Sequence, residues 1–160
     1  MSEPNLRELI ETAATAIRQV WDKTHHILPM YHFIQSDGQE GLMPVGNLPS
    51  KEAAVEVAKL VFERQGVIAY VFVCECWALM GKISDEDVAK AKTGTIANHP
   101  DRKEQIGFIA EGQNGLLSAW INIDRTHEPP TLGKLEVMDE EVTSSEGLMV
   151  GLLPRKGTVQ

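Results

Sequence analysis

The sequence predicts an α+β domain in which an antiparallel sheet of about four to five strands is packed by two main helices. Residues 4–23 and 50–65 each repeat apolar side chains at the i, i+3, i+4, i+7 spacing of an amphipathic helix. Residues 67–74 contain no charged side chain and are rich in β-branched and aromatic residues, which is typical of a strand buried on both faces. Residues 105–124 hold two apolar runs separated by a turn signal, which predicts a hairpin.

The two helices have recognisable ends. In the first, over residues 4–23, Pro4 suits the first helical turn. Its apolar stripe consists of Leu6, Leu9, Ile10, Ala13, Ala14, Ile17, Val20 and Trp21. The second helix begins after Ser50, whose hydroxyl suits an N-cap, and ends at Gly66, which suits the left-handed position after a helix. Each helix therefore has one apolar face to place against a sheet.

The strands differ in how clearly the sequence marks them. Residues 67–74 are expected to form the central strand. Residues 27–35 are expected to form a strand as well, and Pro29 places it at an edge because proline cannot donate a ladder hydrogen bond. Shorter or less regular strand patterns occur at residues 42–43, 132–138 and 148–153, the last of these as an edge strand.

The hairpin prediction rests on Asn114 and Gly115, the pair most typical of a two-residue turn. A type I′ turn at these residues gives a register that separates an apolar face from a polar one, and a slip by one residue would mix the two. The apolar face then pairs Ile106 with Ile123, Phe108 with Ile121 and Ala110 with Ala119. On the other face, Trp120 lies opposite Ile109 among polar neighbours.

Length and composition indicate one domain over residues 1–153 followed by a C-terminal tail over residues 154–160. The formal net charge is −8 and no block of lysine or arginine occurs, so we expect no nucleic-acid partner. No window contains the roughly 18–20 apolar residues that a membrane span needs, so no membrane is expected. The N-terminus has no basic segment followed by an apolar one, so we expect no signal peptide and a cytoplasmic protein.

Cys74 and Cys76 are the only cysteines, and both fall on the predicted central strand. A disulfide between them would close a small strained ring, so we expect two reduced, buried and inert thiols in a reducing compartment. The five histidines do not have the spacing of a helical zinc motif, and no C-x-x-C accompanies them, so no metal is expected. Phosphate-binding and dinucleotide-binding motifs are absent from the sequence, which predicts no cofactor.

Glu75 is the one charged residue in the strand-forming run, and it lies between the two cysteines. If the central strand pairs antiparallel with residues 105–111, Glu75 is expected close to Arg102 or Lys103. A carboxylate in that position most often forms a structural ion pair that holds the base of a loop. The loop is the polar connection over residues 82–104, whose length is typical of a functional or mobile segment.

The same residues also allow a catalytic interpretation. Glu75, His99 and Asp101 are the candidate catalytic residues, because two carboxylates and an imidazole converging on a cleft support general acid–base chemistry. The candidate binding residues are Trp77, Arg102, Glu104 and Trp120. Such a site would suit a small hydrolase or a metal-assisted enzyme at the end of the central strand.

One series of residues carries a resemblance. Glu75-Cys76-Trp77, a long connection, the segment His-Pro-Asp-Arg-Lys-Glu at 99–104 and then a hydrophobic hairpin resemble small uncharacterised bacterial and phage-encoded proteins. The resemblance covers residues 66–124 and implies no activity.

No motif marks a catalytic site, and we expect an interaction or assembly module that self-associates. The central strand needs cover on both faces, from helices or from a second subunit, and Trp120 with Ile109 has the composition of an interface centre. The expected partner is a second copy of the chain, giving a homodimer, or another protein. Two alternatives stay open: the hydrolase or metal-assisted enzyme, and a small-molecule binder that uses a tryptophan-lined pocket.

Overall fold

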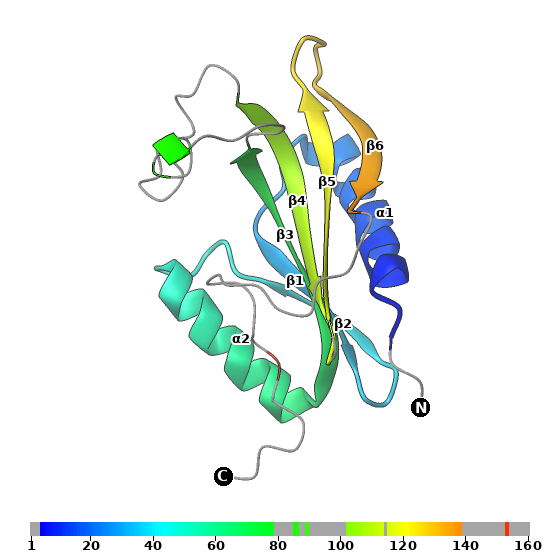
Figure 1. The fold of residues 1–160 in the computed structure, drawn as a ribbon, viewed down its shortest axis with the longest axis vertical. Coiled ribbons are helices and arrows are strands. Elements are labelled where there is room, and N and C mark those ends of the chain that lie inside the picture. The colour runs from blue at the N-terminus through cyan, green and yellow to red at the C-terminus, as the bar shows by residue number, and fades with distance from the viewer. Residues whose placement is uncertain are drawn as a thin grey trace.

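The structure is a computed structural model that describes residues 4–78, 85–86, 89, 102–113, 115–138 and 153. Within these residues the fold is α+β, with one antiparallel sheet of six strands in the order β2-β1-β3-β4-β5-β6 (Figure 1). The elements are α1 (Leu6–Thr24), β1 (Met30–Gln35), β2 (Glu40–Pro44), α2 (Lys51–Gln65), β3 (Val67–Ala78), β4 (Lys103–Glu111), β5 (Leu116–Asp124) and β6 (Thr131–Val137). The class and the two helices agree with the prediction, whereas the predicted strand number of four to five is too low.

The ends of α2 are the predicted ones, whereas α1 begins two residues later than predicted, so that Pro4 precedes the N-cap instead of lying in the first turn. Asn5 caps α1, because its side chain accepts a hydrogen bond from the Glu8 N–H at 3.1 Å, and His25 ends the helix in the left-handed region at φ 53°. Ser50 caps α2 by accepting from the Ala53 N–H at 3.0 Å, and Gly66 ends it at φ 63°. Neither helix among the described residues combines the length and the apolar character needed to cross a membrane.

β1 is the first correction to the strand predictions. It was expected at an edge because of Pro29, but it lies inside the sheet between β2 and β3. Pro29 precedes the strand, so its missing N–H removes no ladder hydrogen bond. The predicted brief return at residues 42–43 is β2, five residues long, and this strand forms the edge instead.

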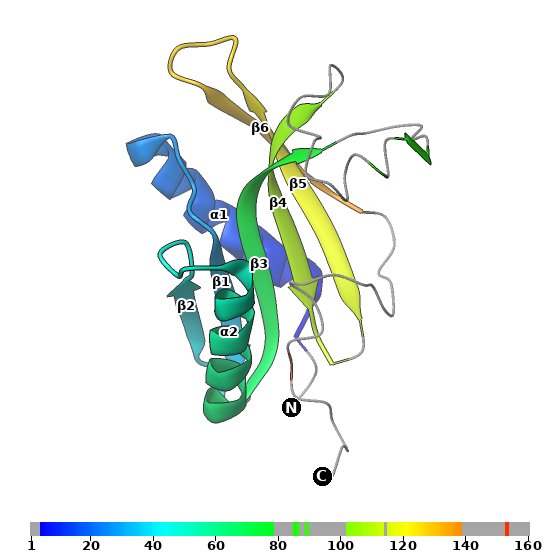
Figure 2. The same cartoon turned by 90° about the vertical axis from the view of Figure 1, so that its left-hand side faces the viewer.

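β3 is the strand around which the sheet is built, and it pairs antiparallel with β1 and with β4. Alternate residues of β3 point to opposite faces of the sheet. Val71 and Val73 belong to a core cluster with α1, whereas Tyr70 and Phe72 belong to a cluster with α2. The two helices therefore cover opposite faces, as Figure 2 shows. The chain's own helices supply the cover that this strand requires.

The β4–β5 hairpin corrects the predicted register by two residues. Ile106 pairs with Ile121 rather than Ile123, and Glu111 pairs with Leu116, so the loop spans residues 112–115 instead of two residues. The Gly112 N–H donates to the carbonyl oxygen of Gly115 at 2.9 Å, and residue 114 lies outside the described residues. A shift of two keeps every side chain on its face, so the predicted sorting of apolar from polar residues is correct.

Several predictions fall outside the described part of the chain. These are most of the connection at 82–104, the edge strand at 148–153 apart from Leu153, and the tail at 154–160. Residues 132–138 were expected to form a strand, and β6 occupies that segment at the second edge of the sheet.

Candidate functional site

The described residues form a cavity of about 640 Å³ between the sheet and the N-terminal part of α2. The residues that line it come from the end of the α1–β1 connection, the β2–α2 connection, the first turn of α2, and strands β3 and β4. They are Pro29, Val45, Gly46, Leu48, Ser50, Lys51, Ala54, Phe72, Cys74, Glu75, Cys76, Gly107 and Ile109.

Strand periodicity determines the sheet side of the cavity. Phe72, Cys74 and Cys76 are alternate residues of β3 and share the face that α2 covers, while Gly107 and Ile109 continue this face on β4. The opposite wall is held by backbone hydrogen bonds. The Val45 N–H donates to the carbonyl oxygen of Pro29 at 3.0 Å, and the Leu48 N–H donates to that of Val45 at 3.2 Å.

The two cysteines place free thiol groups on this wall, and neither is fully buried. The hydrogen bond that Cys76 accepts from the Cys74 thiol lowers the pKa of Cys76; burial opposes this effect, and a hydrogen bond from the Gly107 backbone reinforces it. The hydrogen bond to Cys76, and then burial, raise the pKa of Cys74 well above its usual value. The expectation that both thiols are buried is therefore wrong, because each is half-buried and lines the cavity, whereas their inertness stays a prediction.

Glu75 borders the same cavity, but its carboxylate turns toward the α1–β1 connection. It accepts a hydrogen bond from the Ile27 N–H at 2.8 Å, and its Oε1 lies 3.2 Å from His26 Nδ1. The predicted antiparallel pairing of the two strands is present, with Glu75 opposite Ile106. The carboxylate therefore ties β3 to the connection before β1, rather than serving the base of the 82–104 connection as expected.

The other two candidate catalytic residues, His99 and Asp101, lie outside the described residues. Convergence of Glu75, His99 and Asp101 on one cleft thus stays a prediction. No group of three or more histidine, cysteine, aspartate or glutamate side chains that could hold a metal ion occurs in the described part of the chain.

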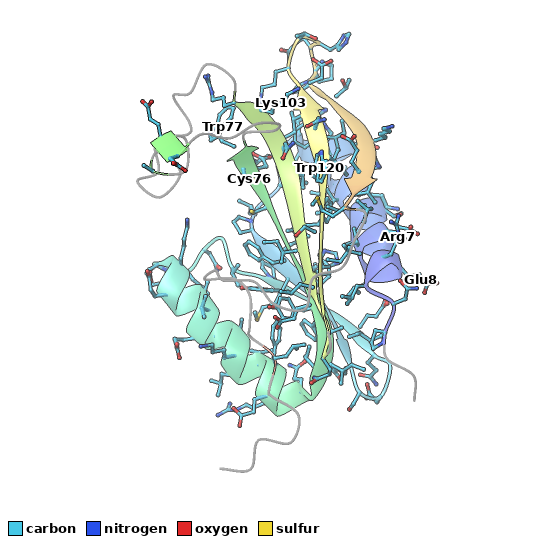
Figure 3. All side chains as sticks on the ribbon, in the orientation of Figure 1. Arg7, Glu8, Cys76, Trp77, Lys103 and Trp120 are labelled. Carbon is cyan, nitrogen blue, oxygen red and sulfur yellow. The ribbon has the colours of Figure 1, made fainter. Side chains whose placement is uncertain are left out.

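Three of the four candidate binding residues lie together where β3 ends and β4 begins. Trp77 pairs with Glu104 across the strands and is 43% exposed; in Figure 3 it lies with Cys76 at the end of β3. The Arg102 guanidinium carbon is 4.9 Å from the centre of the Trp77 ring, which is a cation–π distance. Glu104 binds Arg125, whose Nε donates to the two carboxylate oxygens at 2.7 and 3.0 Å. Sequence reasoning missed Arg125, because its proximity depends on the hairpin register.

Trp120, the fourth candidate, is half-buried within a polar network across β4, β5 and β6. Its Nε1–H donates to Glu136 Oε2 at 3.1 Å, and the Asn122 side-chain amide donates to the same oxygen at 3.3 Å. The Gln105 amide donates to Asn122 Oδ1 at 3.0 Å. These bonds fix the indole ring on the sheet beside its cross-strand partner Gly107, which lines the cavity, although Trp120 itself is not among the lining residues.

Sequence reasoning also missed the cavity. The signal that could have found one wall is the period-two spacing of Cys74 and Cys76, which places both thiols on one face of a strand. The opposite wall could not be found in this way, because it depends on how the β2–α2 connection folds back over the sheet.

Comparisons of the chain with protein-family models, with curated proteins and with solved structures found no match. The resemblance to bacterial and phage-encoded proteins therefore stays a prediction from the sequence.

Proposed function

We propose that this protein binds a small molecule in the cavity between α2 and the β3–β4 surface. The observation that carries the proposal is the cavity volume of about 640 Å³, which lies within the range of protein ligand sites, roughly 300–1,000 Å³. Of the thirteen described residues that line it, six have aliphatic or aromatic side chains, two are glycines and two are cysteines, and three are strongly polar: Ser50, Lys51 and Glu75. This is the usual composition of a site that binds an apolar ligand and orients it with a small number of polar contacts.

The charged groups at the cavity narrow the class of ligand. Lys51 is the one cationic side chain among the described residues that line it. Glu75 is occupied by Ile27 and His26, and the Ser50 side chain accepts from the helix backbone. A molecule with an apolar body and one anionic group would therefore bury its body against Phe72 and Ile109 and place its charge near Lys51.

Binding of 8-anilinonaphthalene-1-sulfonate, which has this composition, tests the proposal. We expect saturable fluorescence enhancement with the unmodified protein. Ala54→Leu adds volume inside the cavity and should weaken binding by at least about tenfold, equivalent to about 1.4 kcal/mol. Val57→Leu is the matched control, because Val57 lies on the same helix, is 38% exposed and is not among the lining residues. Absence of saturable binding, or equal binding by the two variants, would contradict the proposal.

Self-association is the second candidate function, and one observation favours it. In the described part of the chain, β2 forms the sheet edge with β1 as its neighbour, and Leu42 on β2 is 55% exposed. An open edge strand with an exposed apolar side chain can pair with the same strand of another copy. Light scattering over a concentration series should then give the mass of two chains, and Leu42→Lys should return it to one. A single-chain mass for the unmodified protein at every concentration would rule this out.

The structure weakens the two reasons for which self-association was first expected. α1 covers one face of β3 and α2 covers the other. Trp120 is half-buried, and its indole N–H donates a hydrogen bond to Glu136 of the same sheet. Ligand binding in the cavity is therefore the preferred proposal.

A further inference from the structure

We propose that Cys74 and Cys76 form a two-sulfur site for a soft monovalent metal cation, Cu(I), on the wall of the cavity. The site uses the thiols alone, so it does not depend on the proposed binding of an apolar ligand.

The spacing of the two residues suits a bridging ion better than a disulfide. Alternate residues of a strand lie about 6.6–6.8 Å apart at their Cα atoms, at the far end of the range for disulfides, which mostly lie near 5.5–6 Å. The two side chains point to the same face of the strand, and both line the cavity. Metal–thiolate bonds are about 2.3 Å long in zinc sites, so one ion can bridge sulfur atoms separated by up to about 4.6 Å.

Gly107 provides the space for this arrangement. It pairs with Cys74 across β3 and β4, and a Cβ atom placed on it would lie 3.1 Å from the Sγ of Cys76. The Cys76 sulfur therefore lies over Gly107 and leans along the strand toward Cys74. A side chain at residue 107 would push this sulfur away from its partner.

The ligand set selects the metal. Thiolates are soft ligands that favour Cu(I), and Cu(I) is stable with two ligands, whereas structural zinc requires four. The described residues contain no third cysteine, and no larger cluster of metal-binding side chains. Binding breaks two S–H bonds, forms two Cu–S bonds and releases two protons to water, so it needs neither an oxidant nor a reductant. The product carries one negative charge, which the nearby Lys51 ammonium group, also on the cavity wall, helps to balance.

The surroundings give the ion access and then shield it. Both cysteines are half-buried and line the cavity, which provides a route from solvent. Phe72 and Ile109 flank them on β3 and β4, and such apolar neighbours limit the contact of a bound ion with water.

The test is an anaerobic competition for Cu(I) against the chromophoric chelator bicinchoninate. Cys74 and Cys76 are the only thiols in the chain, so no other cysteine contributes to the signal. We expect one Cu(I) per chain, with thiolate-to-copper absorption in the ultraviolet. Cys74→Ser and Cys76→Ser should each weaken binding by more than about 100-fold, beyond the range for changes outside the ligand set, whereas Gly107→Ala should weaken it by about tenfold.

Controls distinguish loss of the metal site from misfolding of a variant, and distinguish the metal proposal from the proposed binding of an apolar ligand. Circular dichroism of each metal-free variant verifies the fold, and Val57→Leu should bind Cu(I) as the unmodified protein does, because Val57 is exposed on α2 and is not among the residues that line the cavity. If the protein binds Cu(I) but not the anilinonaphthalene dye, the metal site is supported and the proposed apolar-ligand site is contradicted. Failure of the unmodified protein to compete for Cu(I), unchanged affinity in both serine variants, or tighter binding of Zn²⁺ than of Cu(I) would overturn the proposal.

Discussion

His32 has a buried ring nitrogen, Nε2, for which the described residues supply no hydrogen-bond partner. It lies on β1 between Leu42 of β2 and Val71 of β3, and strand alternation places it on the face that α1 covers, since Tyr31 and Phe33 belong to the opposite core. Burial lowers the pKa of His32 below its usual value of 6.5. The folded protein therefore holds the imidazole neutral at a pH where the unfolded chain already binds a proton.

His32→Leu should remove this pH dependence. The pKa of His32 is lower in the folded protein than in the unfolded chain, so the unfolded chain binds more protons between these two pKa values. The free energy of unfolding therefore keeps its full value above pH 6.5 and decreases as the pH falls through the lowered pKa. We expect the variant to be more stable by about 1 kcal/mol at pH 7.5, because it lacks a buried nitrogen for which the described residues supply no partner. Its advantage should increase toward pH 5. Urea denaturation across this range measures both effects.

Val57→Leu is the control for the pH series, because it changes an exposed residue that carries no ionisable group. Its stability should differ from that of the unmodified protein by the same amount at every pH. If the His32→Leu advantage were the same at pH 7.5 and pH 5, protonation of the buried imidazole would not be the cause.

At the scale of elements, β3 has two parts with different partners. Its first eight residues lie between the two cores, as the uncharged run predicted, although Phe72 and Cys74 among them also line the cavity. Its last four, from Glu75 to Ala78, pair with the beginning of β4 and carry Cys76 on one face and the carboxylate on the other. The sequence identified Glu75 as a candidate site residue. Its partners Ile27 and His26 could not be predicted, because they depend on the path of the α1–β1 connection, which no local sequence pattern indicates.

The hairpin illustrates the same limit. Its faces were predictable because apolar residues alternate along both strands, whereas its register was not, because a shift of two residues leaves the faces unchanged. Side-chain pairs that cross strands, such as Glu104 with Arg125, depend on geometry that this pattern does not determine. Pro29 was misleading for a related reason: its effect on strand position depends on where the strand begins, and boundaries are the least predictable feature of an element.

Glu75→Ala should loosen the attachment between β3 and the α1–β1 connection. The Ile27 N–H would lose its acceptor, and the Ile27 residue is 1% exposed, so we expect a loss of about 1–3 kcal/mol in the free energy of unfolding. Glu75→Gln retains an oxygen acceptor and should lose clearly less. Urea denaturation at neutral pH compares them. Equal losses in the two variants would show that the backbone hydrogen bond is not what makes this carboxylate stabilising.

At the scale of the whole fold, the described residues form two apolar cores on opposite faces of one sheet, and each core contains its own spectroscopic reporter. Trp21 lies in the α1-side core, and its Nε1–H donates to the carbonyl oxygen of Pro130 at 3.1 Å, joining α1 to the β5–β6 connection. Both tyrosines of the chain, Tyr31 and Tyr70, are fully buried in the α2-side core. Because β3 supplies side chains to both cores, we expect the two helices and six strands to unfold as one cooperative unit.

Phe62→Leu tests this cooperativity. The Phe62 ring is fully buried in the α2-side core, with its centre 5.0 Å from that of Tyr70 and 5.5 Å from that of Tyr31. Its loss should lower the free energy of unfolding by about 1–2 kcal/mol. In a Trp77→Phe/Trp120→Phe background, fluorescence reports Trp21 alone, and second-derivative absorbance reports the tyrosines. Both midpoints in urea should shift together, because the strand between the cores transmits the loss from one face to the other. If the urea midpoint of the tyrosine signal shifted while that of Trp21 did not, the two cores would unfold independently of each other.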